Sequence, residues 1–158
     1  MTAPTSVAGR LAELGITLPK AAAPIASYVP VVVHNGIATV SGQLPFVDGQ
    51  LVTGRVGEDV SLDDGAAAAR DCGLMILAQL EAAGLLERVE RVVKLGAFIS
   101  STPDFTDQPV VANGASDLMS EVFGEAGKHP PGAVRVAVLP RGAAGEEEAI
   151  PSLLADLP

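Results

Sequence analysis

The sequence has one cysteine, no tryptophan and few aromatic residues, and each shortage excludes something. Cys72 cannot form an internal disulfide, and its place in an apolar helical pattern predicts a buried, unreactive thiol. Aromatic residues make up 3% of the 158 residues, while 48% are hydrophobic. The core must therefore consist mainly of Val, Leu, Ile and Ala. A chain of this length and composition can form one domain with a substantial core.

Basic residues are scarce as well. Ten Lys and Arg residues face 19 Asp and Glu residues, giving a net charge of −9. Without a cluster of cations the chain has nothing to neutralise phosphates, so neither nucleic acid nor an anionic membrane is an expected partner. No group of His, Cys and carboxylate residues has the spacing of metal ligands, so no metal site is expected. The sequence has no signal-peptide pattern and no apolar run of membrane-spanning length, which favours a cytoplasmic protein.

The most informative stretch is 28–43, YVPVVVHNGIATVSGQ, which predicts a β-hairpin. Its arms, 28–33 and 37–41, are rich in β-branched residues, and Asn-Gly lies between them. This dipeptide is the strongest short hairpin signal, because both residues tolerate positive φ. We expect the following Ser-Gly-Gln-Leu-Pro to end the strand with a polar corner. That corner is either an ordinary strand exit or the wall of a pocket.

The remaining chain alternates helical and strand patterns. Ser61 is a candidate N-cap for a long helix that ends at Gly84, and Gly124 ends a second helix. The predicted helices are 4–15, 61–84 and 109–123, and the predicted further strands are 91–100, 133–139 and 146–150, the last cut short by Pro151.

Strands outnumber crossover helices in this order, so the sheet should be mixed, with the helices on one face. The fold class is therefore α+β, a two-layer sandwich. Alternation in 133–139 places three valines on one side of the strand and Ala133, Arg135 and Ala137 on the other. A weakly apolar second face with one charge is typical of a subunit interface.

The ordered set of motifs resembles the RidA family, also called YjgF/YER057c/UK114. The matching pieces are PIASYVPVV before IATVSGQLP, the helix after DVS, RVVKLGAFIS before PDF, and AVRVAVLP before EEEAI. The resemblance covers roughly residues 22–150, preceded by an N-terminal helix and arm (1–21) and followed by a tail (151–158). It implies a chorismate-mutase-like fold, a homotrimer with a small-molecule pocket at each subunit interface, and hydrolysis of reactive enamines and imines to a carbonyl compound and ammonia.

The resemblance also implies site residues. Tyr28 matches the pocket tyrosine and Ser41 the serine of the SGQ corner, and both would bind substrate. Glu148 matches the acidic residue of the final EAI strand, which would position the attacking water, and this mechanism needs no cofactor. Active members also carry an arginine that holds the substrate carboxylate, but here its position is Pro131.

Two nearby cations, Lys128 and His129, are candidates to replace the missing arginine in substrate binding, or are solvated surface charges. Glu147 is a second departure, because it occupies an apolar position of the family and suggests a frayed or edge strand. Three functions stay open: an imine or enamine deaminase, a non-catalytic module that binds a small metabolite, and a ribonuclease. The acidic chain argues against the third, because nothing would attract a polyanion.

Overall fold

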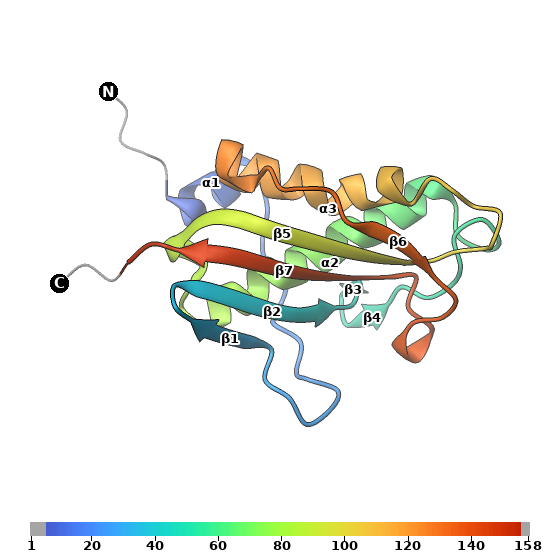
Figure 1. Cartoon of the computed structure of the whole chain (residues 1–158), viewed down its shortest axis with the longest axis horizontal. Helices are drawn as coiled ribbons and strands as arrows, with labels where there is room; N and C mark the ends of the chain where they lie inside the picture. The colour runs from blue at the N-terminus through green and yellow to red at the C-terminus, as the bar shows by residue number, and fades with distance from the viewer. Residues whose placement is uncertain (1–5, 156–158) are drawn as a thin grey trace.

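A computed structural model of the chain describes residues 6–155. Its five-stranded sheet has the order β1-β2-β7-β5-β6, and helices α2 and α3 pack on one face of it (Figure 1). A two-stranded ribbon pairs β3 with β4. The strands are β1 Val31–His34, β2 Ile37–Gln43, β3 Phe46–Val47, β4 Gln50–Leu51, β5 Val89–Ser100, β6 Ala133–Val136 and β7 Gly145–Leu153. The α-helices are α1 Val7–Glu13, α2 Leu62–Ala82 and α3 Gln108–Phe123, and the short 3₁₀ turns are η1 Leu86–Arg88, η2 Gly124–Gly127 and η3 Pro140–Gly142. This mixed sheet with helices on one face confirms the predicted fold class.

The hairpin forms where the Asn-Gly dipeptide predicts it. Asn35 and Gly36 have φ values of 48° and 73°, and β1 pairs antiparallel with β2 on either side of them. The first arm begins later than predicted, at Val31, after Pro30, which lacks an N–H for the ladder. The second arm runs two residues further than predicted, to Gln43. The Ser41–Gln43 corner therefore lies inside β2, at an irregularity in its pairing with β7.

The long helix α2 begins at its predicted cap. The Ser61 hydroxyl accepts a hydrogen bond from the Asp64 N–H at 3.0 Å, and Ser6 caps α1 in the same way. The backbone N–H groups of Val7 and Ala8 also donate to the Glu87 carboxylate, which ties α1 to η1. An acidic group at this position satisfies two otherwise unpaired N–H donors.

The core lies between the sheet and the helices and is aliphatic, as the composition requires. Small residues allow α2 and α3 to pack closely, since a Cβ added at Gly114 would overlap the Ala66 carbonyl oxygen. Cys72 is fully buried in α2, which confirms the prediction of a buried thiol. The largest completely buried apolar side chains are Ile76, Leu77, Leu80, Ile99, Leu118 and Met119.

The last strand differs most from the sequence prediction. β7 is the central strand of the sheet, between β2 and β5, and it continues through Pro151 to Leu153. The expectation of a frayed or edge strand that stops at Pro151 was therefore wrong. Pro151 faces an irregularity in β5 between Val92 and Lys94, where a missing N–H costs little.

The opposite face of the sheet has no helix on it in the described part of the chain. β6 ends at Val136, three residues before the predicted end, and Val134 and Val138 are exposed.

Among residues 6–155 no helix is long and apolar enough to cross a membrane, and no three His, Cys, Asp or Glu side chains gather as metal ligands would.

Candidate functional site

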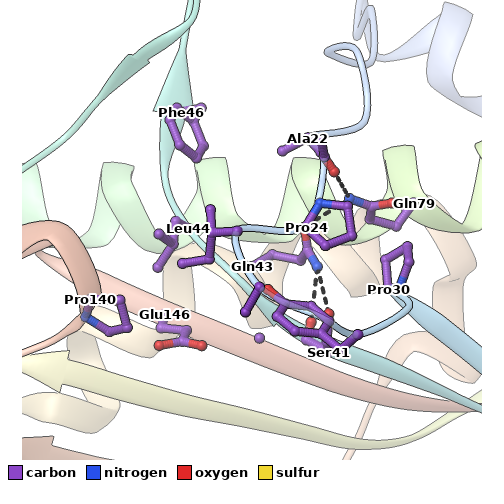
Figure 2. Close-up of a pocket in the computed structure, with 15 residues that line it drawn as sticks. Ala22, Pro24, Pro30, Ser41, Gln43, Leu44, Phe46, Gln79, Pro140 and Glu146 are labelled. Carbon is purple, nitrogen blue, oxygen red and sulfur yellow. Dashed lines mark hydrogen bonds between the residues drawn. The ribbon is translucent and has the colours of Figure 1, made fainter.

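A cavity of about 370 Å³ lies at the end of β2, where several segments that are far apart in the sequence meet. One wall is the extended segment before β1, with Tyr28, and another is the Ser41–Gln43 corner (Figure 2). Pro140 of η3 and Glu146, at the start of β7, close a third side. The polar corner that the sequence left open is thus a pocket wall.

A chain of hydrogen bonds fixes the corner. Gln79 of α2 donates to the Gln43 side-chain oxygen at 3.1 Å and to the Ala22 carbonyl at 2.7 Å (Figure 2). Gln43 in turn donates to the Ser41 hydroxyl at 3.2 Å and to the Ser41 carbonyl at 3.0 Å. Because the Ser41 oxygen accepts from an amide, its own O–H proton can donate to a ligand in the cavity.

Glu146 is the one carboxylate among the residues that line this cavity. A Cβ added at Gly42 would overlap the Glu146 carboxylate oxygen, so only glycine leaves room for this side chain against the β2 backbone. Burial raises the pKa of the Glu146 carboxyl above its ordinary value, and the neighbouring Glu148 charge adds to the rise. A carboxyl whose pKa is raised can accept and return a proton at a pH closer to neutral than an ordinary carboxyl can.

The structure does not bring Glu148 to this cavity. Glu148 lies on the same face of β7 as Glu146, paired in register with Gly96, and it forms an ion pair of 3.5 Å with Lys94. Its role as the water-positioning acid stays a prediction. Alternation could have identified Glu146 as a second candidate, because residues two apart on a strand share a face.

Lys128 and His129 lie elsewhere, at a second cavity between α3 and β5–β6. Lys128 pairs with Glu125 at 2.6 Å. His129 bonds the Pro130 carbonyl at 2.8 Å through Nδ1 and the Ser116 hydroxyl at 2.9 Å through Nε2. A carbonyl can only accept, so Nδ1 donates to the Pro130 carbonyl, and Nε2 and the Ser116 hydroxyl share the second hydrogen bond. The four residues predicted to bind substrate thus divide between two cavities.

No Lys, Arg or His belongs to the 15 described residues that line the first cavity. The nearest cation that the structure links to this lining is Arg141, whose guanidinium is 5.7 Å from the centre of the Phe46 ring, and Phe46 lines the cavity. Arg141 has a φ of 58°, which aims the turn before β7. Local patterns could not have identified this residue, because its stacking on Phe46 depends on how η3 lies relative to β3.

Comparisons with known proteins agree on one family. Residues 8–144 match the model described as "YjgF/chorismate_mutase-like, putative endoribonuclease". The chain is 51% identical over 150 residues to Protein TCP17 of Trypanosoma cruzi, covering 93% of this chain and 94% of that protein.

Two solved structures extend the match. A structure from Shewanella oneidensis titled as a putative endoribonuclease has a TM-score of 0.89 and 31% identity, covering 94% of this chain and 99% of that one. Escherichia coli TdcF with bound serine has a TM-score of 0.58 and 25% identity, covering 87% of this chain and 94% of that one. The chain therefore belongs to the YjgF/chorismate-mutase-like family, the family that includes RidA.

Proposed function

We propose that the chain hydrolyses a small reactive imine, or the enamine that tautomerises to it, to a carbonyl compound and ammonia. The observation that supports this most is the position of Glu146. Its carboxyl, with a raised pKa, borders a small cavity together with Ser41 and Tyr28. TdcF, a relative, is described with bound serine, which favours a ligand of similar size.

In the proposed reaction Glu146 serves as a general base and then as a general acid. The carboxylate takes a proton from water as the oxygen attacks the imine carbon. The protonated acid gives that proton to the imine nitrogen, which leaves a neutral carbinolamine. The carboxylate then takes the proton of the carbinolamine hydroxyl and gives it to nitrogen, as the carbonyl forms and the carbon–nitrogen bond breaks. One water is consumed, one ammonia leaves, and Glu146 ends in its starting state. Ser41 and Tyr28 would orient the substrate.

The substrate anchor is the open point of this proposal. The described lining of the cavity offers no cation, and Pro131, which stands where the family arginine is expected, lines the second cavity instead. A neutral substrate fits this lining. The same feature favours the second candidate function, a module that binds a small metabolite without turning it over.

The oligomeric state belongs to the same proposal. We infer a homotrimer in which the uncovered face of the sheet, with Val32, Ile37 and Val134 exposed, meets neighbouring copies and completes the cavity. A light-scattering mass equal to that of a monomer at micromolar protein concentration would contradict the inferred homotrimer. We place the protein in the cytoplasm. Ribonuclease activity is disfavoured, because a net charge of −9 repels RNA.

The test is ammonia release from imines that an amino-acid oxidase generates in the assay, including imines of uncharged amines. We expect Glu146→Gln to reduce the rate about 100-fold, the size of a lost general acid–base group, and Glu148→Gln to leave it nearly unchanged. The reverse pattern would assign the water to Glu148. Activity gained only by Pro131→Arg would mean that the substrate needs a clamp on the side of the second cavity, which Pro131 lines. Inactivity of the native and Pro131→Arg proteins would favour the binding module.

A further inference from the structure

Glu147 is the least explained side chain of the molecule. It lies in the central strand with 0% of its surface exposed, and neither carboxylate oxygen has a hydrogen-bond partner among the described residues. Leaving a buried polar group unpaired costs free energy that packing must offset. Two explanations exist for such a group in a central strand. Either the protein tolerates the loss of stability, or a ligand supplies the missing hydrogen-bond partner.

The second cavity has Glu147 at its inner end. Its volume is about 690 Å³, and it lies between α3 and the β5–β6 side of the sheet. In register, Glu147 pairs with Ala97, and Ala97 pairs with Ala133, so these residues form one row across β7, β5 and β6 on the helix face. Because the two alanines are small, the row is a trough that runs inward from the β6 edge. Two strand spacings place Glu147 about 10 Å from that edge.

The roof of the trough is one face of α3. Residues that line it recur three or four positions apart, and they are small or polar: Ala112, Asn113, Ser116, Asp117 and Ser120. At the entrance, the hydrogen bond between Ser116 and His129 joins α3 to the segment before β6. The cavity therefore combines an apolar floor, hydrogen-bonding groups near the entrance and an unpaired acid at the inner end.

We propose that this cavity binds a small primary amine, with its ammonium group paired to the Glu147 carboxylate and its alkyl chain lying on Ala97 and Ala133. The ammonium supplies the hydrogen-bond donors that both carboxylate oxygens lack. Since the carboxyl is sealed from water, the ligand reaches it by local displacement of the α3 side chains above the trough. The site is separate from the cavity that contains Glu146, and it does not depend on the proposed deaminase activity.

Charge at the site sets the pH dependence of binding. The Cys72 thiol faces Glu147 from α2, while Asp117, Lys128 and His129 lie on the α3 side and at the entrance. Glu146 and Glu148 flank Glu147 in sequence but point to the other face of the sheet. Burial raises the pKa of Glu147. Below that raised pKa the empty site holds a neutral acid, and pairing with an ammonium releases its proton. The amine should therefore bind more tightly as pH rises, by up to about tenfold per pH unit while Glu147 of the free protein is protonated.

The test is calorimetric titration of the full-length protein with n-butylammonium chloride, with n-butanol as the neutral probe of the same shape. We expect saturable amine binding that tightens from pH 6 to pH 8, and backbone amide NMR shifts centred on Ala97, Ala133 and Ser116. Glu147→Gln should weaken amine binding at least about tenfold, the loss of one charge-assisted pair. Glu148→Gln and Glu146→Gln are matched controls that should bind as the native protein does.

A second variant keeps the Glu147 carboxyl and fills the part of the cavity in which the alkyl chain would lie. Ala97→Leu fills the trough with an apolar side chain, and it should abolish amine binding while thermal unfolding confirms that the protein is folded. Equal affinity of the native and Glu147→Gln proteins for the amine would overturn the proposal. So would butanol binding as tight as that of butylammonium, loss of binding in Glu146→Gln instead, or no amine binding by the folded native protein.

Discussion

Replacing Glu147 by glutamine should make the stability of the protein less dependent on pH. Burial raises the pKa of this carboxyl, so the folded protein holds a proton that the unfolded chain releases above the ordinary glutamate pKa of about 4.3. The folded state then binds more protons than the unfolded state, and the free energy of unfolding falls as pH rises. The decline begins near the ordinary pKa and ends at the raised pKa of the folded protein. Glutamine has the same shape and no proton to lose.

The size of the effect follows from one proton. Each pH unit within this window costs about 1.4 kcal/mol, so the interval from pH 5.5 to 7.5 corresponds to at most about 2.7 kcal/mol. The full slope applies over the part of this interval that lies below the raised pKa of the folded protein. Asp71 and Glu146 also have pKa values raised by burial, but they contribute equally to both proteins. The difference between native protein and variant therefore isolates Glu147.

The assay is urea unfolding of the native protein, Glu147→Gln and Glu148→Gln at several pH values and one fixed protein concentration, since any assembly makes stability concentration-dependent. The gain in stability of Glu147→Gln over the native protein should grow with pH. Glu148→Gln, on the exposed face of the same strand, should show no such trend. A constant difference between native protein and Glu147→Gln across this range would refute the assignment of a neutral, buried acid at this position.

Three further predictions follow from close contacts and caps. Gly42→Ala should displace the Glu146 carboxylate and lower the rate of imine hydrolysis about tenfold, the effect of a misplaced catalytic group. The thermal midpoint of unfolding should stay nearly unchanged. Normal activity of this variant would show that the β2 backbone does not constrain Glu146. Gly114→Ala should destabilise the protein by about 3 kcal/mol in urea unfolding, because its Cβ overlaps the Ala66 carbonyl between α2 and α3. A neutral result would mean that the helices separate easily. Ser61→Ala should cost about 1 kcal/mol by removing the α2 cap, whereas Ser61→Asp should restore most of it in the same measurement.

The sequence by itself determined the elements and their caps. Asn35-Gly36 fixed the hairpin turn, because its φ values are accessible only to a few residue types, and Ser61 fixed the start of α2 through a bond to its own third neighbour. These features depend on contacts within a few residues. The motif order also sufficed to indicate the family and hence the α+β layers.

Only the tertiary structure decided which of these residues meet. Pairing of β7 with both β2 and β5 made it the central strand, and the pairing register put Glu146 at a cavity with Ser41 while Glu147 faced the helices. The same sheet order separated Lys128 and His129 from Tyr28 and Ser41. Alternation along a strand says which residues share a face, but strand order and register depend on contacts between residues far apart in the chain, such as Ala97 with Ala133 and Ile37 with Ser152, which local patterns do not contain.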